Sequence, residues 1–223
     1  MKTSKIILTS YLGVFGLFLL SFLIQVPTKY NKQNEIYFLP ELISLTDFST
    51  YVVTDGELRI ISGKTDTISS VCWNDRKPKN PVCRISGDTL FFKLSEVLYT
   101  QINITEKSNK NLRKILLNNS RIEIRDSTLC SLNIEADKSE VLFQNIKNGK
   151  SLNLNLNDSS QVWLNASKFD SVKLLLNRSK CSFGEESLIK WLQAEIRDSS
   201  ELNIYRILDS HIKADSTSVI SSR

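Results

Sequence analysis

One short pattern recurs six times between Ile115 and Ser221, and it restricts the fold more than any other feature of the chain. Each copy has alternating apolar residues, an Asn or Asp, one intervening residue, a Ser or Thr, and a second alternating run. The Asn/Asp positions are Asn118, Asp137, Asp158, Asn177, Asp198 and Asp215, and the hydroxyl positions are Ser120, Ser139, Ser160, Ser179, Ser200 and Thr217. A turn residue and a strand pattern that return about every 20 residues predict a solenoid of stacked coils.

The apolar residues around each turn predict the faces of these coils. Residues two apart in a strand point to the same side, so pairs such as Leu154/Leu156 and Leu174/Leu176 form an inward face. The first inward positions after the turns are Ile122, Val141, Val162, Cys181, Leu202 and Val219, and a third set is Leu129, Ile146, Phe169, Ile189 and Leu208. Three short sides per coil predict an all-β fold, a right-handed three-sided parallel β-helix over residues 111–223.

Residues 36–110 are expected to form an N-terminal β cap on this solenoid. The segment reads as several short strands, two of which meet at Asp55-Gly56, a dipeptide typical of β-hairpins. A solenoid requires such a cap because an open first coil exposes unpaired backbone and core side chains.

The N-terminus has the pattern of a membrane anchor. Ile6 to Val26 gives 21 residues without a formal charge, ended by Pro27, and about 20 residues cross a hydrocarbon core. The apolar run is longer than that of most cleaved signal peptides, and small residues typical of a cleavage site are missing around Gln25. We therefore expect an uncleaved transmembrane anchor in residues 1–27 and a tether in 28–35. The short basic N-terminus favours the inner membrane, with the C-terminal domain in the periplasm.

Charge and cysteine content exclude some functions and suggest one crosslink. The net charge of +5 comes from scattered Lys and Arg, without the aromatic-interleaved basic face of a nucleic-acid site. The only histidine is His211, so we expect no metal site and no cofactor. Cys72 and Cys83 bracket a loop with two prolines and could form a disulfide in an oxidising compartment. Cys181 is expected to be a small buried apolar residue, and Cys130 has no assigned role.

The repeated Asn/Asp and Ser positions are interpreted first as structural. Asn and Asp side chains bond to the backbone two residues on and tolerate left-handed conformations, which suits a sharp corner. Stacking of coils would also bring Asp137 near Asp158 and Asp198 near Asp215. Paired carboxylates can bind cations or act as acid and base on glycans, so these two readings remain open beside the structural one.

Several segments resemble a known envelope family. These are the strand pair Tyr51-Val-Val and Leu58-Arg-Ile-Ile61, the step Gly87-Asp-Thr-Leu-Phe-Phe92, the strand Ile102-Asn-Ile-Thr105, and Leu112-Arg-Lys-Ile-Leu-Leu-Asn-Asn-Ser120 before the repeated coils. In this order they resemble the auto-transporter adhesin, head GIN domain family of Bacteroidota, over about 170 residues. Members usually have Gly-Ser-Gly at the corners, whereas this chain has Asn/Asp-x-Ser. The resemblance implies a β-helical envelope domain with an adhesive role and carries no catalytic motif.

These features together predict a non-enzymatic, membrane-anchored protein that presents a solenoid surface for binding or adhesion. Leu142 and Trp163 occupy outward positions in adjacent coils and could form an apolar patch for a glycan or envelope protein, although packing under a loop is an equal alternative. An open coil near the C-terminus predicts end-to-end self-association. The alternative function is a polysaccharide-active enzyme that uses the corner carboxylates.

Overall fold

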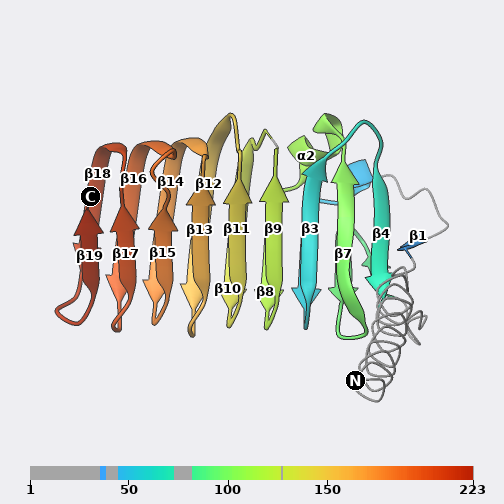
Figure 1. Ribbon diagram of the computed structural model, residues 1–223, viewed down its shortest axis with the longest axis horizontal. Coiled ribbons are helices and arrows are strands. Elements are labelled where there is room, and N and C mark those ends of the chain that lie inside the picture. The colour runs from blue at the N-terminus through green and yellow to red at the C-terminus, as the bar shows by residue number, and fades with distance from the viewer. Residues whose placement is uncertain (1–35, 39–44, 73–81, 127, 223) are drawn as a thin grey trace, which may run out of the picture.

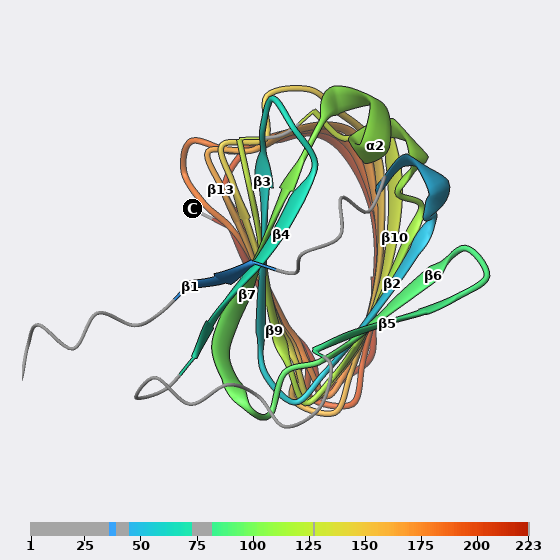
Figure 2. The same ribbon diagram turned by 90° about the vertical axis from the view of Figure 1, so that its right-hand side faces the viewer.

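The computed structural model describes residues 36–38, 45–72, 82–126 and 128–222, and these residues form mostly β-strands (Figure 1). The strands run across the long axis of the molecule and stack along it, which confirms the predicted β-solenoid. Seen along that axis, two sheets form opposite walls around an apolar interior (Figure 2). The described helices are η1 (Leu45–Asp47) and α2 (Glu106–Asn111), which contact each other.

The strands divide between two sheets, in each of which the spatial order differs from the order along the chain. From one edge to the other, sheet A contains β1 (Ile36–Phe38), β4 (Thr67–Cys72), β7 (Val97–Ile104), β3 (Glu57–Ser62), β9 (Arg121–Arg125), β11 (Glu140–Gln144), β13 (Gln161–Asn165), β15 (Lys180–Phe183), β17 (Glu201–Ile204) and β19 (Val219–Ser222). Sheet B contains β18 (Ile207–Ala214), β16 (Leu188–Arg197), β14 (Lys168–Asn177), β12 (Gly149–Asn157), β10 (Ser131–Asp137), β8 (Lys114–Asn118), β2 (Thr50–Thr54), β6 (Thr89–Lys93) and β5 (Cys83–Ser86).

Two sheets replace the three walls that the sequence predicted. The expected third wall merges with sheet B, because β14 begins at Lys168 and continues past the third inward position, Phe169, to Asn177. Asp170 and Ser171 both lie on the outer side of this strand, which therefore bends without a break. The strand continues through this bend, and its parallel pairing with β16 skips Asp170 and resumes at Ser171.

The core consists of vertical columns of apolar side chains, as predicted. One column on sheet B contains Leu117, Ala136, Leu156, Leu176 and Ile196, which are paired successively in parallel register and buried. Its counterpart on sheet A contains Ile122, Val141, Val162, Cys181 and Leu202. Each coil thus covers the apolar face of its neighbours, and burial of these columns is the main force that holds the stack together.

The coils do not follow one another strictly in chain order. The coil formed by β2 and β3 lies between the coil of β6 and β7 and the coil of β8 and β9, with parallel pairing on both sides. The 36–110 section thus contributes parallel coils as well as the antiparallel strands β4 and β5 at the end of the stack.

The predicted hairpin at Asp55-Gly56 is wrong. β2 and β3 belong to different sheets, so the dipeptide forms a corner of the solenoid. Asp55 has the left-handed φ of 57° that a tight hairpin would also need. The local signal is therefore the same for both turns, and only the partners of the flanking strands distinguish them.

The last coil is shifted by one residue from the expected register. Leu202 pairs with Ile220, not with Val219, because the corner from Asp215 to Ser218 is one residue longer than assumed. Likewise Ile207 pairs with the buried Ile189, whereas Leu208 points outward and is 71% exposed.

The cysteines and the apolar N-terminus complete the comparison with the sequence. Cys83 is a free thiol on β5 in sheet B, whereas Cys72 ends β4 in sheet A, so the expected disulfide is not formed. Burial raises the pKa of the Cys83 thiol to about 11. Cys181 is buried in its predicted column. The described residues contain no helix that is long and apolar enough to cross a membrane, and Ile6–Val26 lies outside them.

Candidate functional site

Buried serines connect consecutive coils at the corner that follows sheet B. The backbone N–H of Ser120 donates to Ser139 Oγ at 3.1 Å, and the Ser139 N–H donates to Ser160 Oγ at 3.2 Å. The Ser179 N–H donates to Ser200 Oγ at 3.1 Å in the same way. All five serines are buried. The hydroxyl thus satisfies an N–H of the preceding coil that a corner would otherwise leave unpaired in the interior.

A second serine ladder lies at another corner and was not recognised in the sequence. The Ser167 N–H donates to Ser187 Oγ at 3.1 Å, and both side chains are buried. Each hydroxyl also donates to a backbone carbonyl, that of Asn165 from Ser167 at 2.9 Å and that of Leu164 from Ser187 at 2.7 Å. The spacing of 20 residues between Ser167 and Ser187 was the available signal, but serines elsewhere in the chain, such as Ser131 and Ser151, have the same spacing.

We expect Ser160→Ala to lower the free energy of unfolding by about 2 kcal/mol. The Ser160 hydroxyl donates its one proton to the Asn157 carbonyl at 2.6 Å, with the Ala136 carbonyl at 3.0 Å as the alternative acceptor, and it accepts the Ser139 N–H. Alanine would leave that N–H buried without a partner. Urea denaturation of the full chain measures the change, and Ser171→Ala, on the outer side of β14, is the control expected within about 0.5 kcal/mol of the parent. Equal effects of the two substitutions would contradict the structural role of the ladder.

The Asn and Asp residues play more varied roles at the corners than expected. In the shorter corners the left-handed residue is the one after the Asn or Asp, as at Lys138 and Arg178, each with φ of 49°. In the longer corners Asp158 and Asp198 are themselves left-handed, with φ of 48° and 54°. The Oδ1 atoms of Asp137 and Asn177, in contrast, are buried without a hydrogen-bond partner among the described residues.

Of the two carboxylate pairs expected at the corners, Asp198 and Asp215 are adjacent as predicted, whereas Asp137 and Asp158 are out of register. Asp137 pairs in register with Asn157, which places Asp158 one residue further along, where it forms an ion pair with Arg178. Asp215 accepts the backbone N–H of Asp198 at 2.7 Å, so this contact is between a carboxylate and the backbone. Hydrogen bonds, first from the Ser218 hydroxyl, hold the pKa of Asp215 well below its usual range. Within the described ranges no group of three or more His, Cys, Asp or Glu side chains is placed to hold a metal ion.

The structure places Leu142 and Trp163 side by side on the outer face of sheet A. They pair directly in register, and both are half-buried. The row continues from Trp163 to Ser182 on β15 and Asn203 on β17. The row therefore begins with an apolar and an aromatic side chain and continues with small polar side chains along one face of the solenoid.

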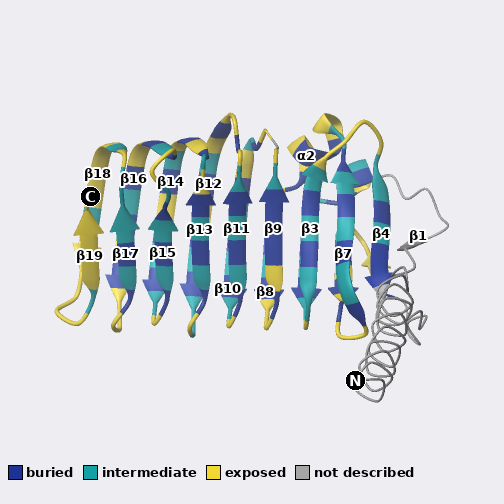
Figure 3. Cartoon of the chain, in the orientation of Figure 1, coloured by how far each residue is buried: buried dark blue, intermediate teal, exposed yellow. Residues whose placement is uncertain are grey.

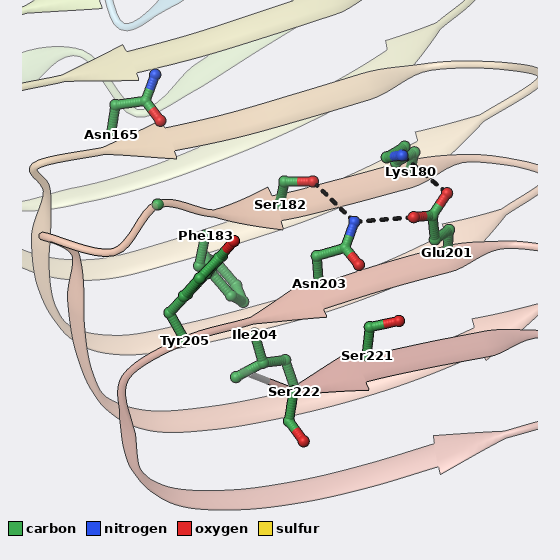
Figure 4. A pocket seen from close by; sticks show the side chains of 11 residues that line it. Asn165, Lys180, Ser182, Phe183, Glu201, Asn203, Ile204, Tyr205, Ser221 and Ser222 are labelled. Atoms are coloured by element: carbon green, nitrogen blue, oxygen red, sulfur yellow. Dashed lines mark hydrogen bonds and ion pairs between the residues drawn. The ribbon is translucent and has the colours of Figure 1, made fainter.

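A groove of about 530 Å³ lies at the C-terminal end of this row. We refer to it as the sheet A groove; its lining includes Asn165, Lys180, Ser182, Glu201, Asn203 and Tyr205. Figure 4 shows several of these side chains joined by polar contacts on neighbouring strands. Asn203 Nδ2 donates to Ser182 Oγ at 3.2 Å and to Glu201 Oε1 at 2.9 Å, and Lys180 Nζ lies 2.8 Å from Glu201 Oε2.

These contacts determine the chemical character of the groove. The hydrogen bond and charge of Lys180, together with Asn203, lower the pKa of Glu201. Glu201 is therefore an ionised acceptor at neutral pH, suited to receiving hydrogen bonds from a hydroxyl-bearing ligand. Asn203 and Asn165 add both donors and acceptors, and Tyr205 adds an aromatic ring with a polar tip.

The polar members of the groove were missed in the sequence because they are distributed over different coils. Lys180, Ser182, Glu201 and Asn203 occupy outward positions on β15 and β17, where the sequence alone reads as a solvated face. The only available signal was the continuation of the Trp163 row into later coils, which requires the register of the sheet.

Several other hollows lie on the described surface. One of about 460 Å³ on the outer face of sheet B is lined by amides and charges that include Asn133, Asn153 and Gln193. Another of about 260 Å³ is lined by Cys130 and by several lysines. Neither of these two hollows is lined by a Trp or Tyr ring, whereas Tyr205 lines the sheet A groove and Trp163 lies on the neighbouring strand β13. Comparison of the chain with protein-family models found no match, and comparison with curated proteins found none either.

Proposed function

We propose that the protein is a membrane-anchored envelope protein whose solenoid binds an oligosaccharide in the sheet A groove. The observation that carries the proposal is the outward row from Trp163 through Ser182 to Asn203, which ends in a groove lined by amides, a carboxylate and Tyr205. Trp and Tyr rings present large faces with low conformational entropy, and adaptable polar groups beside them give orientation to a hydroxylated ligand.

The geometry of the solenoid supports binding of an extended chain. Adjacent strands of a sheet lie about 4.8 Å apart, so equivalent side chains in successive coils form a regular series along the axis. The polar groups on β15 and β17 are held by one another, as the contacts of Asn203 show. A preorganised set of this kind loses little entropy when a ligand binds.

The remaining parts of the proposal rest on the sequence. Ile6–Val26 would anchor the chain in the inner membrane and place the solenoid in the periplasm. The segments that resemble the head GIN domain family imply the same envelope location and an adhesive, non-catalytic role. We also propose a right-handed coil, which parallel crossover connections almost always adopt.

Replacement of Trp163 by alanine tests the proposed function. We expect Trp163→Ala to weaken binding of an oligosaccharide from a panel of neutral and acidic glycans by about tenfold or more, as for other central aromatic contacts. Isothermal titration calorimetry of the detergent-solubilised full chain measures the affinity. Trp191→Ala is the matched control, since Trp191 is an outward-facing tryptophan, 40% exposed, that lies on sheet B away from the groove.

Two results would contradict the proposed function. One is the failure of the parent protein to bind any glycan of the panel. The other is equal affinity of the parent protein, Trp163→Ala and Asn203→Ala for the glycan that binds. Circular dichroism of each variant must match that of the parent, because Trp163 lies outside the core columns and its loss is not expected to unfold the coils.

A further inference from the structure

The coil of β18 and β19 leaves core positions uncovered at one end of the solenoid. Ile220 is 43% exposed, whereas Leu202, its neighbour in the same inward column, is completely buried. Figure 3 shows this coil as an exposed surface at the end of the stack. β18 and β19 are also the last strands of their sheets in the described structure, so one backbone edge of each is unpaired there. Exposed apolar side chains next to unpaired strand edges are a surface suited to pairing with another β-structure.

The opposite end of the solenoid does not offer a complementary surface. It carries the antiparallel strands β1 and β5, which pair with β4 and β6. The core residues beneath them, such as Tyr51, Leu90 and Phe92, are buried. A head-to-tail stack that continues the parallel coils is therefore disfavoured, and contact between two identical open ends is favoured.

A twofold axis perpendicular to both sheets can join two such ends. Rotation by 180° about this axis reverses the strand direction but leaves the inner and outer faces of each sheet on the same sides. β18 would therefore pair antiparallel with β18 of a second copy. The Asp215 N–H donates to the Ile196 carbonyl of β16 at 3.1 Å. Because backbone groups alternate in direction along a strand, those of Ser210 and Ile212 face the free edge.

The charge pattern of β18 selects one register for this pairing. If His211 lies on the twofold axis, Ser210 pairs with Ile212 of the second copy through backbone hydrogen bonds. Asp209 then faces Lys213 of the second copy, and the reciprocal pair forms on the other side of the axis. In antiparallel sheets the positions between hydrogen-bonded pairs have Cα atoms about 4.5 Å apart, which suits an ion pair. Within the described structure Asp209 and Lys213 are both exposed, and neither has an ion pair in its own chain.

We propose that the protein forms a tail-to-tail dimer through antiparallel pairing of β18 centred on His211. The contact covers Ile212 and Ile220 with the same residues of the second copy and extends both sheets across the interface. It also places the two sheet A grooves on the same side of the dimer, so that one extended ligand could contact both. The dimer depends on β18 and not on the proposed ligand, and the two proposals can therefore fail separately.

Charge reversal tests the pairing and its register. Sedimentation analysis of the detergent-solubilised full chain should show a dimer whose dissociation constant rises about tenfold or more for Asp209→Lys and for Lys213→Asp, since each change places like charges opposite one another. The double variant D209K/K213D restores both pairs with reversed sign and should dimerise within about threefold of the parent. A monomeric parent, or a double variant no better than the single ones, would overturn the proposal.

A crosslink on the twofold axis gives an independent readout. His211→Cys should form a disulfide between two copies under mild oxidation, because the Cα separation expected there lies within the range for disulfides. Gln193→Cys is the matched control: Gln193 pairs with His211 from the adjacent strand β16, and two copies of it would be too far apart to crosslink. Crosslinking of both variants to the same extent, or of neither, would show that the proposed register is incorrect.

Discussion

Gly149→Ala should lower the free energy of unfolding by about 3 kcal/mol, the upper range for overpacking of a core. A Cβ at this position would lie 2.2 Å from Cδ1 and 2.3 Å from Cε1 of Phe169, the residue paired with Gly149 in the next coil. The Phe169 ring cannot move away easily, because it is buried and packs edge-on against Phe143 with ring centroids 5.8 Å apart. Urea denaturation followed by circular dichroism measures the loss.

A double-mutant cycle assigns this effect to the contact between the two residues. Phe169→Leu removes part of the ring and creates space beside Gly149. We therefore expect the double variant G149A/F169L to be more stable than the sum of the single effects predicts, by about 1 kcal/mol or more. Additive effects would show that the Gly149 substitution acts through something other than the Phe169 ring.

A second large loss of stability is expected for Gly56→Ala, again about 3 kcal/mol or more. A Cβ on Gly56 would lie 2.5 Å from Leu94 Cβ and 2.8 Å from the Leu94 carbonyl oxygen. The Leu94 N–H donates to the Thr54 carbonyl at 3.0 Å, which holds the two coils close together at this corner. The clash is with the Cβ and the backbone carbonyl of Leu94, which are fixed by the main chain, so relief requires a shift of a whole coil.

Gly87→Ala is the control for both glycine substitutions. Gly87 has a left-handed φ of 60°, but a Cβ there would meet no atom within 4 Å. Its replacement should therefore cost only the conformational strain of about 1–2 kcal/mol. A loss for Gly56→Ala no larger than that for Gly87→Ala would show that the approach of Leu94 does not limit this corner.

The repeat was sufficient to predict the columns of the core, but it did not predict the order of the coils or the number of walls. Residues such as Leu156 and Leu176 are one coil apart, and their burial depends only on the coil next to them. The position of β2 and β3 between later coils depends instead on which sheet edges are free after the chain has passed through β6 and β7. No local pattern encodes that choice, and Asp55-Gly56 consequently read as a hairpin.

The candidate site likewise has one part that the repeat predicted and another part that only the tertiary structure shows. The neighbouring positions of Leu142 and Trp163 followed from the repeat, because one register relates all the coils from β9 to β17. The sheet A groove and the serine ladders required the tertiary structure, since Asn203 and Ser182 meet only when two successive coils are aligned to within one residue. The shorter and longer corners shift that alignment, as the pairing of Asp137 with Asn157 shows.

The sequence by itself therefore determined that the chain is a solenoid and which apolar side chains are stacked within it. Periodic burial is a local requirement, and each coil must satisfy it against its neighbours. The tertiary structure alone decided that there are two sheets, that one coil is inserted out of order, and that polar side chains converge in a groove. These features depend on contacts between residues far apart in the chain. The free energy of those contacts is shared among many coils, so the sequence of a single coil does not specify them.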